Sequence, residues 1–467
     1  MSPRSPLPNR SLVGVRFLLV TLGCFRNEVE SDLLRSALDA LGLAETASLD
    51  AADVIIVNTC GFIRESCEEG VDTLLELAAC SSGLDARPPI LALGCMGERY
   101  GRELLSAMPE IACVLGAGWD AGIEEALCAV LDGERYAQEE APAGAAIRPG
   151  RERSFDSSEN ATLFVRVADG CDRSCAFCAI PSIRGRYKSR PVAEITKEIE
   201  RLSSGREREV VMVAQDLTSY GADLGDEASL VKLIEAVTAL DNVRWLRLLY
   251  LQPEGVTEEL IEAVAGNPVV CDYFDVPFQH VSGAVLRAMG RPGDERWCME
   301  LVEAIRKRCP EAALRTTMMV GYPGETEEDF ARLLSFVEEA RFDWLGAFVY
   351  SPEEGTRAAG LRSTVAAGTA TARYGRILEL QDSVEASALE RFQGRDIEVL
   401  VDADADVDGY DLLGRSYREA PVVDGVIYLK PAGGGRRTPG LEVGRFVMAT
   451  ITGQEGLDLV GEIRDTE

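Results

Sequence analysis

Short apolar runs alternate with helical patterns over most of this 467-residue chain, and this alternation limits the possible folds more than any other feature of the sequence. In residues 15–130, the predicted strands 17–21, 54–58 and 90–93 are each followed by a helical pattern. Asn27 is expected to cap the first of these helices. Because strands that alternate with helices form parallel sheets, we predict a doubly wound α/β domain over residues 15–130.

The rest of the chain divides into three further segments. Residues 138–160 are rich in Ala, Gly, Pro, Ser and charged residues and lack an apolar period, which is typical of a linker. Residues 161–388 contain six predicted strands that alternate with helices, too few for an eight-unit (β/α) barrel, so we expect a six-unit partial (β/α) barrel. Residues 391–467 carry short β patterns between Gly, Pro and Asp clusters, which predicts a small C-terminal β-barrel. The predicted strands are 163–167, 210–213, 245–251, 273–276, 314–320 and 344–350 in the partial barrel, and 397–401, 426–429 and 446–452 in the C-terminal barrel.

Charge and cysteine content narrow the class of protein. The chain has 48 Lys and Arg against 78 Asp and Glu, a formal net charge of −30, so nucleic acid could bind only at a local basic patch. The apolar run 17–20 before Cys24 is too short for a signal peptide, and no window reaches the roughly 18 apolar residues of a membrane span. We therefore expect a cytoplasmic protein with no membrane partner, in which clustered thiols among the 13 cysteines bind metal.

Three of the cysteines form a CxxxCxxC motif just after the first predicted strand of the partial barrel. These residues, the loop triad, are Cys171, Cys175 and Cys178. Three thiolates on one short loop can bind three irons of a 4Fe–4S cluster and leave the fourth iron open to chelate S-adenosylmethionine, whose reductive cleavage gives a 5′-deoxyadenosyl radical. The alternatives are buried thiols or a zinc site, which needs a fourth ligand although the only histidine, His280, is far along the chain. The spacing resembles the signature of the radical-SAM superfamily.

Three more cysteines directly follow the three predicted strands of the first domain. These residues, the strand-end triad, are Cys24, Cys60 and Cys95. Ligands of open parallel sheets bind beyond the carboxyl ends of the strands, and the glycines beside these cysteines allow the backbone to approach a bulky group closely. We expect the three thiols to share one crevice and to bind a second cluster, with one iron open for sulfur. The alternative is that they are small buried residues, which is our interpretation of the other seven cysteines: Cys67, Cys80, Cys113, Cys128, Cys271, Cys298 and Cys309.

Further motifs narrow the function: residues 58–63 (NTCGFI), 214–221 (AQDLTSYG), 277–280 (PFQH), and 414–421 (GRSYREAP) followed by Asp424 and Gly425. With the two triads, they make the chain from about residue 15 onward similar to the radical-SAM methylthiotransferase family, whose members carry a C-terminal TRAM barrel. The motifs resemble the RimO type, which modifies a ribosomal protein, whereas tRNA-modifying relatives usually have Gly-Gln-Asn in place of 214–216. Segments 24–27 and 275–278 differ mildly from the commoner family versions, and none of the differing positions is a cysteine.

The resemblance implies an activity and its cofactors. The activity is methylthiolation of the β-carbon of an aspartate in protein twelve of the small ribosomal subunit. The cofactors are two 4Fe–4S clusters and S-adenosylmethionine, which supplies both the methyl group and the radical, with an external electron donor and a sulfur source. The alternatives are methylthiolation of a tRNA adenosine and, in another class, a non-catalytic iron–sulfur electron carrier, which would ligate every iron.

The charge of the C-terminal segment bears on the choice of partner. Residues 391–467 contain nine basic and fifteen acidic residues, whereas an RNA-binding module is expected to be basic. The ribosomal protein implied by the resemblance is basic, so an acidic surface complements it, and tRNA is not the expected partner. Asp402, Asp404, Asp406 and Asp408 alternate along one predicted edge, where they suit either a basic protein or solvent.

Three features keep two interpretations each. The turn 321–326, with Thr326 and Asp329 in a capping arrangement, either contacts the adenosine of the cofactor or is a tight strand-to-helix turn. His280 either faces the substrate or is a core residue, and the core interpretation is favoured. The basic run after the loop triad either meets a carboxylate-bearing substrate or lies in a solvated loop; its members are Arg184, Arg186, Lys188 and Arg190.

Overall fold

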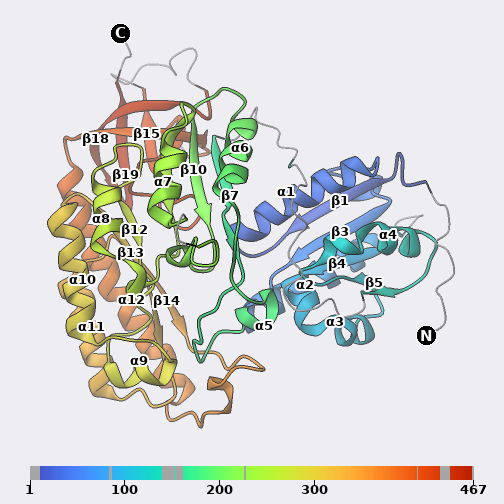
Figure 1. The fold of residues 1–467 in the computed structure, drawn as a ribbon, viewed down its shortest axis with the longest axis horizontal. Helices are drawn as coiled ribbons and strands as arrows, with labels where there is room; N and C mark the ends of the chain where they lie inside the picture. The colour runs from blue at the N-terminus through green and yellow to red at the C-terminus, as the bar shows by residue number, and fades with distance from the viewer. Residues whose placement is uncertain are drawn as a thin grey trace. The chain divides into compact units, whose positions relative to one another are not determined.

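The computed structural model describes residues 11–83, 87–138, 153, 161–225, 228–407, 409–431 and 442–464. The chain divides into two compact units (Figure 1). The first comprises Met1–Phe155, Asp169–Lys188 and Ser351–Ala359, and the second comprises Asp156–Ala168, Ser189–Tyr350 and Gly360–Glu467. The predicted linker 138–160 lies outside the described residues except for positions 138 and 153.

The first unit contains a six-stranded sheet with the order β2-β1-β3-β4-β5-β6, in which all neighbours are parallel. Its central strands β3 (Val54–Thr59) and β4 (Ile90–Gly94) are buried along their whole length, as in parallel sheets with both faces covered. Helices α2 (Arg64–Ser81) and α3 (Cys95–Ala107) share one apolar cluster with these two strands. The prediction of a doubly wound α/β domain is confirmed. The other elements are β1 (Arg16–Thr21), α1 (Phe25–Ala40), β2 (Ala44–Glu45), η1 (Leu49–Ala51), β5 (Ile111–Val114), η2 (Trp119–Ala121), α4 (Ile123–Leu131) and β6 (Tyr136–Ala137).

The first helix begins earlier than the apolar pattern indicated. The N-cap of α1 is Cys24, which makes no side-chain capping hydrogen bond, so the expectation that Asn27 caps this helix is wrong. Gly23 adopts a φ of +97°, and the chain turns into the helix directly after it. Asn27 therefore lies inside the first turn, where its side-chain amide donates to the carbonyl oxygen of Leu22 at 2.6 Å.

Two segments from later in the sequence belong to the same unit. Helix α5 (Ile180–Arg184) follows the loop triad and packs against the start of α3, with Ile183 and Cys95 in one buried cluster (Figure 1). In the segment Ser351–Ala359, Glu353 accepts a hydrogen bond from the guanidinium of Arg99 at 3.0 Å. The CxxxCxxC loop therefore folds together with the N-terminal sheet. The short strands β8 (Ala168–Asp169) and β9 (Lys188–Ser189) flank this loop.

The second unit contains the partial barrel. Its six parallel strands form two sheets with the orders β11-β10-β7 and β12-β13-β14, and an isolated bridge between Leu246 and Val270 joins β11 to the segment before β12. The six-unit partial (β/α) barrel is confirmed. The strands are β7 (Thr162–Arg166), β10 (Arg208–Val213), β11 (Val243–Leu248), β12 (Tyr273–Asp275), β13 (Ala313–Val320) and β14 (Trp344–Val349). The helices are α6 (Val192–Ser203), η3 (Leu217–Ser219), α7 (Leu230–Thr238), η4 (Pro253–Gly255), α8 (Glu258–Ala265), α9 (Gly283–Met289), α10 (Glu295–Arg308), α11 (Glu327–Ala340), α12 (Ala367–Leu389) and η6 (Glu390–Phe392). The short helix η5 (Ala358–Gly360) begins in the first unit and ends at the first residue of the second.

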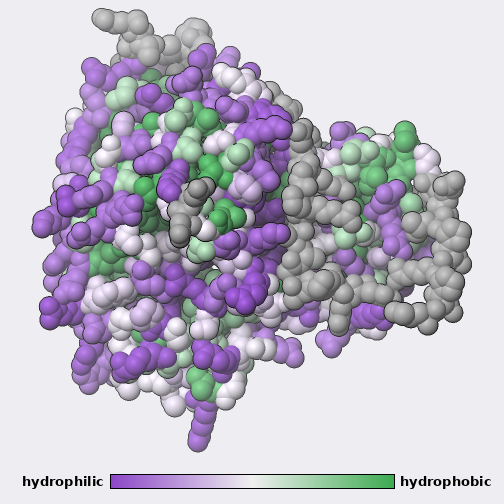
Figure 2. All heavy atoms as spheres, viewed as in Figure 1, coloured by the Kyte–Doolittle hydropathy of each residue, from purple (hydrophilic) through white to green (hydrophobic). Residues whose placement is uncertain are grey.

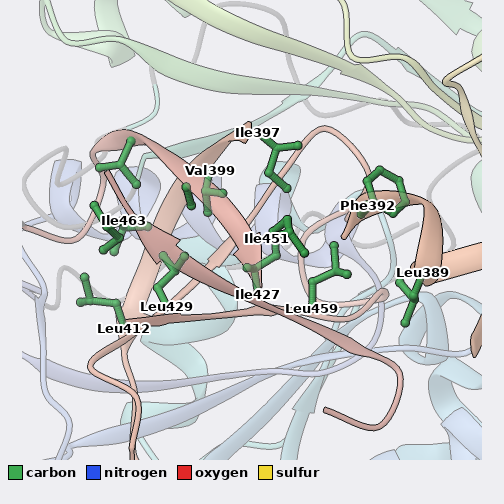
Figure 3. Close-up of a cluster of buried hydrophobic side chains, with 13 residues drawn as sticks. Leu389, Phe392, Ile397, Val399, Leu412, Ile427, Leu429, Ile451, Leu459 and Ile463 are labelled. Atoms are coloured by element: carbon green, nitrogen blue, oxygen red, sulfur yellow. The ribbon is translucent and has the colours of Figure 1, made fainter. Parts of the chain in front are cut away.

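The C-terminal segment of this unit forms a closed five-stranded barrel with the order β15-β16-β17-β19-β18. Its strands are β15 (Asp396–Asp404), β16 (Leu412–Arg415), β17 (Ile427–Lys430), β18 (Phe446–Glu455) and β19 (Asp458–Ile463). Inward-facing aliphatic side chains such as Val399, Leu429 and Ile451 fill the interior, and Leu389 and Phe392 from the preceding helical segment join them (Figure 3). The predicted small β-barrel is therefore confirmed.

Buried ion pairs join this C-terminal barrel to the partial barrel. Glu209, near the start of β10, accepts hydrogen bonds from Arg247 at 2.7 Å and from Arg415 of β16 at 2.8 Å. Burial by itself would raise the pKa of Glu209, but the two guanidinium groups overcome that effect and lower the pKa to about 2. At another strand start, Arg418 lies over the ring of Trp344 at 4.3 Å. Because removing one partner leaves a buried charge uncompensated, the two barrels depend on each other for stability.

Within the described ranges, no helix is both long enough and apolar enough to cross a membrane.

Candidate functional site

The strand-end triad lies at the carboxyl ends of three neighbouring strands. Cys24 caps α1 after β1, Cys60 directly follows β3, and Cys95 is the first residue of α3 after β4. Because β3 pairs with both β1 and β4, the three cysteines lie at the same edge of the sheet. The structure thus brings together three residues that are far apart in the sequence.

Two glycines permit this close approach. A Cβ atom on Gly23 would lie 2.6 Å from Cβ and 3.2 Å from Sγ of Cys60. A Cβ atom on Gly61 would lie 2.7 Å from the carbonyl carbon of Cys95. Because non-bonded carbon atoms attract best at about 3.5–4.0 Å, any larger residue at either position would push the cysteines apart.

The surroundings of Cys60 and Cys95 favour the neutral thiol unless a cationic group binds them. Burial, with a contribution from the neighbouring Cys95 and Cys24, raises the pKa of Cys60 to about 11. Burial also raises the pKa of Cys95, against the opposing effect of Arg184. Metal binding deprotonates such thiols, so this donor set fits an iron–sulfur cluster. In the described part of the chain, no three His, Cys, Asp or Glu side chains form a group that could hold a single metal ion.

The loop triad lies between β8 and α5, and its three side chains are half-buried. The backbone N–H of Cys171 donates to the carbonyl oxygen of Gly185 at 3.2 Å, which closes the loop at its base. Gly170, directly before this cysteine, has a φ of +73°, and a Cβ atom there would lie 2.1 Å from the carbonyl oxygen of Arg186. The three thiols therefore lie on one compact loop that is suited to holding three irons of one cluster.

A buried polar network joins the strand-end triad to the residues on either side of the loop triad. From α5, Arg184 donates to the Sγ atom of Cys95 at 2.9 Å and to Glu30 of α1 at 3.0 Å, and its second terminal nitrogen also donates to Glu30. Arg26 lies 3.8 Å from the same carboxylate and donates to Asp169 at the start of the loop. Sequence reasoning missed Glu30, Arg26 and Asp169; the one available signal was that charged positions of α1 fall on the buried face of that helix.

The basic run after the loop triad does not act as one group. Arg184 is buried, whereas Arg186, two residues later, is exposed and pairs with Asp172 at 3.2 Å. Lys188 is exposed. Arg190 pairs with Glu198 at 2.6 Å. Neither interpretation offered for the run describes Arg184, which faces a cysteine of the other triad rather than solvent or a substrate.

His280 and the turn after β13 lie within the second unit. The Nδ1 atom of His280 accepts hydrogen bonds from the backbone N–H groups of Val281 and Ser282 at 2.8 and 2.9 Å, and the residue is fully buried. These contacts are those of a core histidine. Thr326 and Asp329 form the capping box at the start of α11, as the sequence indicated. The turn 321–326 is thus a strand-to-helix turn, and a contact with adenosine stays a prediction.

The same three-part organisation is found in known proteins. Family models match residues 16–116 (Uncharacterized protein family UPF0004), residues 165–337 (Radical SAM superfamily) and residues 394–463 (TRAM domain). The protein "Ribosomal protein uS12 methylthiotransferase RimO" of Moorella thermoacetica is 38% identical over 96% of this chain and 100% of its own length. Its namesake in Salinispora tropica is 40% identical over 98% of this chain and 97% of its own, and that in Aquifex aeolicus is 38% identical over 96% and 97%.

The chain belongs to the RimO family. It is a radical-SAM methylthiotransferase, and the predicted family is confirmed. Membership of the radical SAM superfamily implies an iron–sulfur cluster and S-adenosylmethionine as cofactors. Among solved structures, the radical S-adenosylmethionine methyltransferase TsrM from Kitasatospora setae matches with a TM-score of 0.52 and 17% identity, over 72% of this chain and 75% of that one, which shows a shared fold.

Proposed function

We propose that this RimO family member attaches a methylthio group to the β-carbon of an aspartate in protein uS12 of the small ribosomal subunit. The observation that carries the proposal is the near full-length similarity, 37–40% identity over at least 95% of the chain, to proteins named for this activity. Such a substrate implies that the enzyme works in the cytoplasm.

We further propose two 4Fe–4S clusters, one held by the loop triad and one by the strand-end triad. When bound, the clusters and S-adenosylmethionine supply the radical, the methyl group and the sulfur, with an external electron donor and a sulfur source. The chain's own residues hold these groups in place. The loop closure between Cys171 and Gly185 fixes the loop triad, and Gly23 and Gly61 allow the strand-end triad to gather at one edge of the sheet. Three thiolates leave one iron of each cluster open, which suits group transfer better than electron carriage.

The acidity of the chain supports a basic protein partner over tRNA. Hydrophilic side chains predominate on the face shown in Figure 2, and the net charge of the chain is −30. On β15, Asp402 is exposed, but it accepts hydrogen bonds from Arg415, so its charge is already paired. Asp404 and Asp406 are exposed, and Asp408 lies outside the described residues. We propose that the exposed aspartates of this edge contribute to attraction of the basic ribosomal protein.

The test is mass spectrometry of ribosomal proteins and of tRNA from a strain that lacks this gene. The proposal expects uS12 to lose the mass of one methylthio group while tRNA is unchanged. Complementation with the intact gene should restore the modification, and complementation with either triad replaced by alanine should not. Loss of a methylthio group from tRNA, with uS12 unaffected, would favour the adenosine-modifying alternative. No change in either would favour a non-catalytic electron carrier.

A further inference from the structure

Arg184 stands out because it follows the CxxxCxxC loop closely in the sequence and its side chain contacts Cys95 of the strand-end triad. It is the last residue of α5, six positions after Cys178, and its side chain is 3% exposed. Its guanidinium donates to the Sγ atom of Cys95 at 2.9 Å and makes a bidentate contact with the carboxylate of Glu30. A buried arginine is costly unless its donors are satisfied, so a contact with a thiol sulfur in this position calls for an explanation.

Glu30 orients this guanidinium. The carboxylate is fully buried and accepts hydrogen bonds from both terminal nitrogens of Arg184. This bidentate contact fixes the orientation of the planar guanidinium, so that a remaining N–H points toward the Sγ atom of Cys95. Arg26 stands 3.8 Å from the same carboxylate and also contacts Asp169. The donor to Cys95 is therefore held by a carboxylate that is itself paired with a second arginine.

Hydrogen bonds to cysteine sulfur change the properties of an iron–sulfur cluster. They stabilise the extra negative charge of the reduced state, and together with burial they set the reduction potential. A neutral thiol gains little from a buried guanidinium, whereas a metal-bound thiolate gains a charge-assisted hydrogen bond. The geometry around Sγ of Cys95 is thus the one expected around a cluster ligand.

We propose that Arg184 is a positioning residue for the second cluster: it donates a hydrogen bond to the Cys95 thiolate and thereby raises the reduction potential of the cluster held by the strand-end triad. This inference rests on the proposed function, because it requires a cluster at that triad. The reduction potential of the second cluster would then depend on the segment that carries the loop triad, because Arg184 lies at the end of α5, the helix that follows that loop.

The experiment uses the full chain with the loop triad replaced by alanine, so that the second cluster is the one observed. In this background, Arg184→Met removes the donor. Arg184→Lys keeps the charge and can still donate. Arg184→Met with Glu30→Gln removes the buried pair together, so that no carboxylate is left uncompensated. Arg186→Met is the matched control, because Arg186 is an exposed arginine on the same loop. Iron content and an electron paramagnetic resonance redox titration are measured for each variant.

The inference expects about four irons per chain in the background protein. It expects the reduced-to-oxidised ratio at a fixed potential to fall at least tenfold in both Arg184→Met variants, which is a shift of 59 mV for one electron. Arg184→Lys should recover part of this shift, and Arg186→Met should have none. Full occupancy with an unchanged potential in either Arg184→Met variant would overturn the inference and leave the proposed function standing. Absence of iron from the background protein, with Arg184 intact, would instead overturn the assignment of a cluster to the strand-end triad.

Discussion

Replacing Gly170 by alanine should dislodge the loop that carries the loop triad. The new Cβ atom would lie 2.1 Å from the carbonyl oxygen of Arg186 and 2.6 Å from its carbonyl carbon, and both atoms belong to backbone that cannot rotate away. The left-handed φ of +73° costs an alanine about 1–2 kcal/mol. Overpacking adds about 1–3 kcal/mol, and displacement of residues 185–186 removes the Cys171 hydrogen bond, worth about 1 kcal/mol. The sum is about 3–6 kcal/mol.

Gly205→Ala separates the steric contact from the backbone strain. Gly205 has nearly the same φ, +74°, but a Cβ atom there meets nothing within 4 Å, so this variant should cost only the 1–2 kcal/mol of the left-handed conformation. Both variants are compared by urea denaturation of the apoprotein and by iron bound to the loop triad in chains whose strand-end triad is alanine. We expect Gly170→Ala to lose most of that iron and Gly205→Ala to retain it. Equal iron content and equal denaturation midpoints would refute the view that tight packing at Gly170 holds this loop.

Three further outcomes follow from the structure. Alanine in place of the loop triad should halve the iron content and abolish cleavage of S-adenosylmethionine, whereas alanine in place of the strand-end triad should halve the iron and leave cleavage intact; loss of cleavage in the second case would reverse the division of labour. Burial raises the pKa of Glu385 from 4.5 to about 8 despite Arg418, so the stability that its protonation contributes is present below pH 4.5 and is lost as pH rises toward 8. In thermal unfolding, the Glu385→Gln chain should be as stable as the parent chain at pH 4.5 and more stable than it at pH 8. Equal changes in stability with pH for the two chains would contradict this. Asp404→Asn with Asp406→Asn should weaken binding of uS12 at low salt and change it little at high salt, because exposed charges are screened over about 8 Å at physiological ionic strength; an equal loss at all salt concentrations would exclude long-range attraction.

The fold was largely predictable because apolar runs report burial directly. Each strand of the partial barrel and each strand that leads into the strand-end triad was located to within a few residues, since their side chains are buried and their neighbours are turn formers. Most of the elements that were missed lack that signal, although β5 is a largely buried apolar strand that was also missed. β2 and β6 are two-residue edge strands, and β16 and β19 contain glycine and charged residues whose pairing is set by closure of the C-terminal barrel rather than by their own sequence.

The positions of the candidate site residues were predictable, but their connections were not. Cysteines at strand ends identify an edge of a sheet because topology alone places those ends together. Arg184 and Glu30 are 154 positions apart, and nothing in either local pattern distinguishes a buried arginine from the exposed Arg186 two residues later. That distinction depends on α5 packing against α3, which is a tertiary contact with no local signature.

A side-by-side incubation of the reconstituted enzyme with uS12 and with unmodified tRNA, each with S-adenosylmethionine, a reductant and a sulfur source, decides which substrate receives the methylthio group. Intact-mass and fragment spectra should show one methylthio group gained by a single aspartate of uS12 and none gained by tRNA. A methylthio group on the tRNA with uS12 unchanged would contradict the account.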